Sequence, residues 1–225
     1  MPPPRGYPRS GTSVQLVHDV SSAKRALRAR IRAERRGRDP RQRQDDAEAL
    51  AVVIRELPEI KASRCVTAYV SMPTEPATGP LRKALHNAGI RVLLPIVLPG
   101  GVLEWAEDSG LLRPASGPGG DEPIGPRLGV AAIATADVIL IPALAVDTLG
   151  YRLGQGAGYY DRALPLAAPG VPVIAIVNTS EVLDAAVEPV PTEPHDCRVD
   201  AVVTPRGCLH LQPTLRWPRP HAGSR

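Results

Sequence analysis

Phenylalanine is absent from this 225-residue sequence, and its seven aromatic residues are five tyrosines and two tryptophans. Three cysteines, Cys65, Cys197 and Cys208, are odd in number and lack C-x-x-C spacing, so we expect reduced, buried thiols in a cytoplasmic protein. No apolar run approaches the roughly 18 residues of a membrane-spanning helix, and the N-terminus lacks the apolar core of a signal peptide. These absences argue against a membrane protein and against one stabilised by disulfides.

Lysine is also scarce, because the 27 basic residues include only Lys24, Lys61 and Lys83, and the net charge is +4. Ten basic residues nevertheless lie between Lys24 and Arg43, against two acidic ones. Such a cluster can indicate nucleic-acid binding, but these residues recur all round an expected helix without interleaved aromatic or glycine residues, which favours a solvated helix surface. We therefore expect no nucleic-acid partner. A nucleic-acid-binding protein, whose affinity would fall steeply with salt, stays open as an alternative.

The pattern along the chain predicts one domain. We expect residues 1–18 to be disordered, 19–212 to form a single α/β domain, and 213–225 to be a flexible tail. Strands alternate with helices, which indicates a mostly parallel, Rossmann-like sheet flanked by helices, and we expect a monomer. The expected strands are 65–70, 91–97, 102–108, 136–147, 171–177 and 199–204. The expected helices follow Ser21 or Ser22, Pro40 and Gly79 and open again at Tyr159, whereas 111–126 should lack regular structure.

The stretch GYRLGQGAGYYDR, from Gly150 to Arg162, holds four glycines, three tyrosines and two arginines around one aspartate. Glycines let backbone N–H groups approach an anionic ligand closely. The spacing G-x-G-x-G matches neither the dinucleotide-binding motif nor the P-loop. Arg152 suits a phosphate and Asp161 suits a magnesium ion that bridges phosphates, so we expect a phosphorylated ligand.

Three other polar loops follow or precede buried strands: SMPTEPAT (71–78), NTSE (178–181) and VPTEPHD (190–196). Ligands of α/β sheets bind at the carboxyl ends of the strands. We therefore expect these loops and the glycine loop to share one site.

The segment IPALAVDTLGYRLGQGAGYYDRAL resembles the signature of the 5-formyltetrahydrofolate cyclo-ligase family. SSAKRALR resembles the opening helix of that family, SMPTEPATGPL its glutamate-containing segment, and VPTEPHDCRVDAVVTP its late aspartate segment, in the same order over residues 21–205. The resemblance implies an enzyme, dependent on ATP and Mg²⁺, that cyclises 5-formyltetrahydrofolate to 5,10-methenyltetrahydrofolate by phosphorylating the formyl oxygen, with release of ADP and phosphate. It also implies the α/β layout of sugar-phosphate isomerases and CoA transferases.

The resemblance further implies roles for individual residues. The implied ATP-binding residues are Lys24, Arg25, Ala26, Leu27, Arg28, Arg152, Leu153, Gly154, Gln155, Gly156, Ala157, Gly158, Tyr159 and Tyr160. The implied folate-binding residues are Val70, Glu75, Trp105, Gln155, Gly156 and Tyr159. The implied magnesium ligands are Asp161 and Asp196. Asp147 lies at the carboxyl end of an expected strand and is expected behind the metal, and His195, beside Asp196, is expected to have a merely local role.

Two of these assignments agree with simple chemistry. Lys24 and Arg28 lie one helical turn apart, so both can reach a single phosphate chain, while Arg25 and Arg32 are expected on other faces and should matter little. Glu75 can accept the two adjacent donors of an aminopyrimidine ring.

The chain also departs from the family pattern. Val146 stands where phenylalanine is usual, and Gln155 and Ala157 stand where many relatives are basic. The lost positive charge leaves open a folate- or nucleotide-binding paralogue without turnover. A different enzyme on the same layout, such as a sugar-phosphate isomerase or a CoA transferase, would need a base or a glutamate nucleophile and would leave the Lys24–Arg28 pair without a role.

Overall fold

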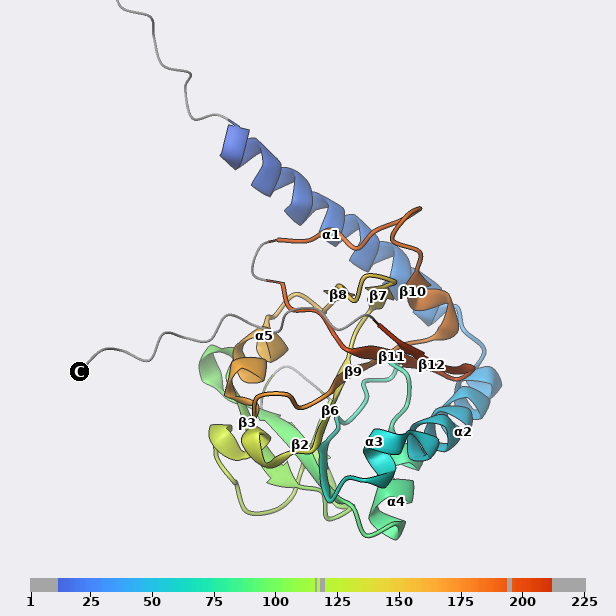
Figure 1. Ribbon diagram of the computed structural model, residues 1–225, viewed down its shortest axis with the longest axis vertical. Coiled ribbons are helices and arrows are strands. Elements are labelled where there is room, and N and C mark those ends of the chain that lie inside the picture. Colours follow the sequence, from blue (N-terminus) through green and yellow to red (C-terminus); the bar gives the residue numbers. More distant parts are fainter. Residues whose placement is uncertain (1–11, 116, 118–119, 194–195, 212–225) are drawn as a thin grey trace, which may run out of the picture.

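The computed structural model describes residues 12–115, 117, 120–193 and 196–211, with side chains from residue 19 onward. Its centre is a seven-stranded sheet in the order β12-β11-β9-β6-β1-β2-β3 (Figure 1). The five inner strands are parallel, and the two edge strands are antiparallel to their neighbours. The inner strands are β1 (Cys65–Thr67), β2 (Arg91–Val97), β6 (Val138–Pro142), β9 (Val173–Ile176) and β11 (Ala201–Thr204), and the edges are β3 (Leu103–Glu107) and β12 (Gly207–His210). This arrangement confirms the predicted α/β fold.

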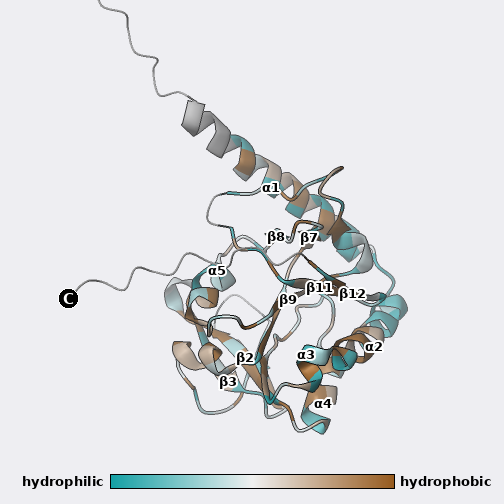
Figure 2. Ribbon diagram, in the orientation of Figure 1, coloured by the Kyte–Doolittle hydropathy of each residue, from teal (hydrophilic) through white to brown (hydrophobic). Residues whose placement is uncertain are grey.

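Both faces of the sheet are covered, which explains why its strands are continuous apolar runs (Figure 2). One face packs against three helices, α2 (Pro40–Glu56), α3 (Pro58–Lys61) and α4 (Gly79–Asn87). The other face packs against α5 (Tyr159–Ala163) and the 3₁₀ turns η2 (Val130–Thr135) and η3 (Leu164–Leu166). Successive residues of one strand therefore enter different cores: Leu94 faces the first layer and Leu93 the second.

A small second sheet positions the first helix. Its strands are β10 (Val182–Leu183), β7 (Ala145–Asp147) and β8 (Arg152–Leu153). Leu27 and Ile31 of α1 (Thr12–Arg36) pack on Leu144 and Leu153 of this region, so α1 lies across the glycine loop (Figure 1).

Several boundaries differ from the sequence-based prediction. Helix α1 begins at Thr12, so residues 12–18, expected to be disordered, are helical. Residues 12–20 contain neither proline nor glycine, the two residues that most disfavour a helix. The apolar run 136–147 forms two strands, β6 and β7, because the chain leaves the large sheet after Pro142 and joins the small one. The segment 111–126 contains a short hairpin of β4 (Leu112–Pro114) and β5 (Asp121–Pro123). Residues 1–11 and the expected tail, 213–225, lie outside the described residues.

The remaining turns are η1 (Pro99–Gly101), which joins β2 to β3, and η4 (Thr179–Glu181), which follows β9. Within the described ranges, no helix is long and apolar enough to cross a bilayer.

Candidate functional site at the carboxyl ends of the strands

Four basic side chains of α1 contact three separate loops at the carboxyl end of the sheet. They are Lys24, Arg28, Arg32 and Arg35, spaced by four, four and three residues, which places them along one face of a helix. We call these four residues the α1 stripe. Their partners lie in the late loop 190–196, in the glycine loop and in η4. The predicted convergence of loops is therefore organised by the first helix.

Lys24 is held between two carboxylates of the late loop. Its Nζ lies 2.7 Å from Glu193 Oε2 and 2.7 Å from Asp196 Oδ2, and the residue is only 9% exposed. Burial by itself lowers the Lys24 pKa, but hydrogen bonds from Nζ to Asp196 and Glu193, together with their charges, outweigh burial and raise that pKa above its ordinary value. Lys24 is therefore a firmly protonated cation. The partner Glu193 was not among the predicted site residues.

Arg28 and Arg32 fix the backbone of the glycine loop. Arg28 Nε donates to the carbonyl oxygen of Gly154 at 2.9 Å, and Arg32 Nη2 donates to both the backbone and the side-chain oxygen of Gln155 at 2.9 Å. Gly156 has a φ of +104°, and a Cβ there would lie 3.4 Å from Arg28 Cζ, so glycine suits this close approach. The expectation that Arg32 lies on an unrelated face of α1 is wrong, because Arg32 is two turns beyond Lys24 on the same face.

Burial lowers the pKa of the Arg28 guanidinium, and the neighbouring charge of Arg32 lowers it further. Two close cations whose charges repel favour the arrival of an anion between them. The side of α1 that faces the glycine loop therefore suits a phosphate.

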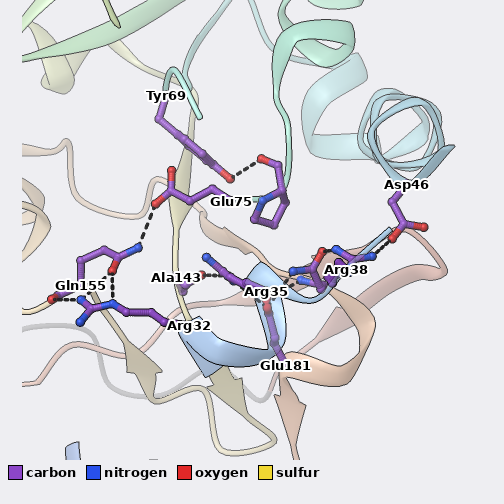
Figure 3. A network of polar contacts seen from close by, with 11 residues as sticks. Arg32, Arg35, Arg38, Asp46, Tyr69, Glu75, Ala143, Gln155 and Glu181 are labelled. Atoms are coloured by element: carbon purple, nitrogen blue, oxygen red, sulfur yellow. Dashed lines mark hydrogen bonds and ion pairs between the residues drawn. The ribbon is translucent and has the colours of Figure 1, made fainter. Parts of the chain in front are cut away.

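Glu75 is connected to this face through Gln155 (Figure 3). The Glu75 side chain is 7% exposed; its Oε2 accepts from the Met72 backbone N–H at 3.0 Å, and its Oε1 accepts from Gln155 Nε2 at 3.2 Å. The chain Arg32–Gln155–Glu75 thus links the helix expected to hold the nucleotide with the carboxylate expected to hold the folate. A neutral Gln155 can both accept from Arg32 and donate to Glu75, whereas a basic residue could only donate.

The two expected magnesium ligands are each paired with a cation. Asp161 forms an ion pair with Arg152, whose Nη1 also donates to the carbonyl oxygen of Cys197 at 2.8 Å. Asp196 accepts from Lys24, as described above. No cluster of three or more carboxylate, imidazole or thiol groups suited to a metal occurs among the described residues.

Asp147 has a structural task. It is fully buried, and its carboxylate accepts from the backbone N–H groups of Leu149, Tyr151 and Val190 at 3.0, 2.9 and 3.1 Å. His195 lies outside the described residues.

The remaining residues predicted to bind ATP or folate differ in their exposure to solvent: some are buried, some half-buried and some exposed. Leu27 and Leu153 pack together in an apolar cluster, whereas Arg25 is exposed and donates to Ser22 Oγ at 3.0 Å. Ala26, Gly156 and Ala157 are exposed, and Val70, Gly154 and Gly158 are half-buried.

The three aromatic residues predicted for the site belong to one apolar cluster below the glycine loop. Trp105 is 0% exposed there, and Tyr159 and Tyr160 pack against the same cluster. Trp105 therefore does not reach the surface beside Glu75. The hydroxyl of Tyr160 is buried without a hydrogen-bond partner among the described residues, and burial, then the charge of Glu75, raises the Tyr160 pKa so that the phenol stays neutral.

Comparison with known proteins gives consistent results. Residues 20–205 match the model of the 5-formyltetrahydrofolate cyclo-ligase family. A 5-formyltetrahydrofolate cyclo-ligase of Mycolicibacterium smegmatis is 40% identical over 84% of this chain and 98% of its own, and one of Escherichia coli is 30% identical over 78% and 96%. The NMR structure of the 5,10-methenyltetrahydrofolate synthetase of Aquifex aeolicus superposes with a TM-score of 0.71 at 25% identity, covering 89% of this chain and 99% of that one.

Proposed function

The chain belongs to the 5-formyltetrahydrofolate cyclo-ligase family and catalyses the conversion of 5-formyltetrahydrofolate to 5,10-methenyltetrahydrofolate, and we propose that it does so with ATP and Mg²⁺ where the α1 stripe meets the glycine loop. The observation that carries this placement is the direct contact of Arg28 and Arg32 with Gly154 and Gln155. It puts fixed cations beside bare backbone, the combination that a polyphosphate needs.

The reaction needs activation of an unreactive group. An N-formyl carbonyl resembles an amide, and its oxygen is a poor leaving group. The formyl oxygen attacks the γ-phosphate of ATP, which releases ADP; the nitrogen at position 10 then attacks the formyl carbon, and the oxygen leaves as inorganic phosphate. Phosphoryl transfer depends on positioning and charge neutralisation, so a site of cations and backbone amides suffices without a serine or cysteine nucleophile.

The nucleotide is assigned to the helix and loop that the structure brings together. Lys24 and Arg28 supply charge to the phosphates, and the backbone from Arg152 to Tyr160 supplies N–H donors. Leu27 and Leu153 support this surface from below, since they pack on each other. A phosphate that reaches Lys24 Nζ competes with Glu193 and Asp196, the present partners of that atom.

The carboxylates of Asp161 and Asp196 fit a hard divalent cation in their donor chemistry. Both stand at the edge of the proposed phosphate site, because their present partners Arg152 and Lys24 belong to it. With two carboxylates, the rest of a magnesium coordination shell would come from phosphate oxygens and water. The ion would supply charge neutralisation for the phosphates.

The folate is assigned to the side of the site marked by Glu75. Val70 and Tyr159 offer apolar walls. Gln155 donates to the carboxylate, and Gly156 follows Gln155 in the glycine loop. Trp105 contributes from beneath, through the cluster that it shares with Tyr159.

One assay tests the whole proposal. The protein is incubated with 5-formyltetrahydrofolate, ATP and Mg²⁺, and the absorbance of 5,10-methenyltetrahydrofolate is followed. We expect product only when ATP is present. Binding of both ligands without product would instead indicate a paralogue that has lost turnover. Salt-sensitive nucleic-acid binding without folate binding would indicate a nucleic-acid-binding protein.

Replacing Asp161 by asparagine is expected to raise the magnesium concentration required for half-maximal activity, because one anionic ligand is lost. The measurement is a magnesium titration of the initial rate at saturating ATP and folate. Asp45→Asn, at an exposed position of α2, serves as the control and should behave as wild type. An unchanged magnesium requirement in the Asp161 variant would remove Asp161 from the metal site.

Lys24→Arg is expected to fold normally and to lose about tenfold or more in kcat/KM for ATP, a loss equivalent to about 1.4 kcal/mol. The compact ammonium of Lys24 meets two carboxylates at 2.7 Å, and a longer, planar guanidinium cannot take the same position. Folate affinity should change little. Arg25→Lys is the matched control, because Arg25 is exposed on the same helix; Arg32 does not suit this purpose, because it contacts Gln155. Normal use of ATP by Lys24→Arg would argue that the phosphates rest on the glycine loop alone.

A further inference from the structure

Arg35, the last residue of the α1 stripe, has a buried guanidinium with one unsatisfied nitrogen. The residue is 1% exposed. Its Nε and Nη2 each donate to the Glu181 carboxylate at 2.7 Å, and Nη2 also donates to the carbonyl oxygen of Ala143 at 2.7 Å. Its Nη1 has no hydrogen-bond partner among the described residues. A charged N–H without an acceptor is rare in a protein interior and suggests that a ligand completes it.

Arg35 lies at the carboxyl end of the large sheet. Ala143 directly follows β6, and Glu181 lies in the turn that follows β9, so the guanidinium spans the carboxyl ends of two central strands. Ligands of parallel sheets bind at this edge.

The free side of the guanidinium lies toward the proposed folate site. In Figure 3, Glu75, Tyr69 and Gln155 lie on one side of Arg35, whereas Arg38 and Asp46 lie on the other. Burial lowers the Arg35 pKa, but hydrogen bonds to Glu181 and the nearby charges of Glu181 and Glu75 raise it above its ordinary value, so the group stays a cation. Arg35 and Glu75 thus present a donor and an acceptor to the same space.

A pterin ring matches this pair. Its pyrimidine edge carries, side by side, an amino group, a ring N–H and a carbonyl oxygen, that is, two donors followed by one acceptor. Glu75 can take the two donors. The acceptor then needs a donor next to Glu75, and the α1 stripe offers one in Arg35.

We propose that Arg35 Nη1 donates a hydrogen bond to the ring carbonyl oxygen of the pterin, beside the two donors that Glu75 accepts. This inference rests on the proposed function, since it assigns the orientation of the same substrate. Arg35 is thereby a specificity-determining residue: it favours a ring with an acceptor at this position over one with an amino group, which would place donor against donor.

The test compares Arg35→Lys with Arg82→Lys. Arg82 is a matched control, because it also makes a buried bidentate pair, with Asp108 at 2.7 and 2.7 Å, but lies in α4, away from the α1 stripe. The dissociation constant of 5-formyltetrahydrofolate is measured for both variants, together with that of ATP and the unfolding temperature. We expect about a 10- to 100-fold loss of folate affinity in Arg35→Lys only, with ATP affinity retained in both. Wild-type folate affinity in a folded Arg35→Lys protein would show that Arg35 serves only the structure.

A second variant covers the case in which Arg35→Lys does not fold. Arg35→Met combined with Glu181→Leu removes both buried charges together, which proteins often tolerate. It should show the same selective loss of folate affinity, and retention of folate affinity would overturn the inference. If neither variant folds, the wild-type structure with bound 5-formyltetrahydrofolate decides: Arg35 Nη1 must lie within hydrogen-bond distance of the ring carbonyl oxygen, and a longer separation overturns the inference.

The outcomes also distinguish a failure of the proposed function from a failure of the role of Arg35. A wild-type protein that neither binds nor cyclises 5-formyltetrahydrofolate overturns the proposed function and this inference together. A wild-type protein that cyclises it, with folate affinity unchanged in the Arg35 variant, overturns only the role of Arg35.

Discussion

Glu181→Leu is expected to lower the free energy of unfolding by about 3–5 kcal/mol, because it leaves the charge of Arg35 buried without its partner. The exposed fractions of the two side chains are 1% for Arg35 and 3% for Glu181, so water cannot replace the lost carboxylate. The variant also loses two hydrogen bonds from Asn178, whose backbone N–H and side-chain amide both donate to Glu181 at 2.7 Å.

Urea unfolding at fixed pH measures this effect. Glu107→Leu is the control, since its ion pair with Arg91 is 54% and 39% exposed and is worth about 0–1 kcal/mol. Arg35→Met combined with Glu181→Leu should recover much of the lost stability, because no isolated charge remains. A loss of less than about 1 kcal/mol in Glu181→Leu would mean that the Arg35 charge finds another partner when Glu181 is gone.

The sequence predicted the sheet well because the signal for buried parallel strands is local. Each inner strand is a short apolar run bounded by polar loops. The alternation of such runs with helices predicts a sheet with helices packed on its faces. The run 136–147 shows the limit: residues 138–146 are apolar throughout, yet they serve two sheets. Ala145 of β7 packs in the cluster that contains Leu27 and Ile31 of α1, a contact that the local sequence does not indicate.

The contacts of the candidate site are harder to predict than the sheet, because most of them are not local in the sequence. Lys24 and Arg28 are the first two positions of a spacing that continues to Arg32 and Arg35, but basic residues occur all round α1 and hide this pattern. The partners are also distant: Arg35 and Glu181 are 146 residues apart, and Lys24 and Glu193 are 169 apart. Contacts over such separations are set by the fold and leave no local mark in one sequence.

Glu75→Ala is expected to weaken the binding of 5-formyltetrahydrofolate by about a hundredfold or more, because two ring donors lose their acceptor at about 1–3 kcal/mol each. The Glu75 carboxylate is well prepared for this task, since the Met72 backbone and Gln155 already fix both of its oxygens. Titration of the protein with 5-formyltetrahydrofolate, by calorimetry and without nucleotide, measures the loss.

ATP binding in the absence of folate should barely change in this variant. The glycine loop does not depend on Glu75 for its position, because Arg28 and Arg32 hold Gly154 and Gln155 independently of it. Glu122→Ala is the matched control: Glu122 is 6% exposed, pairs with Arg113 and lies in β5, so it tests the effect of losing any buried glutamate. A Glu75→Ala protein that loses ATP affinity but keeps folate affinity would contradict the assignment and would move Glu75 to the nucleotide side of the site.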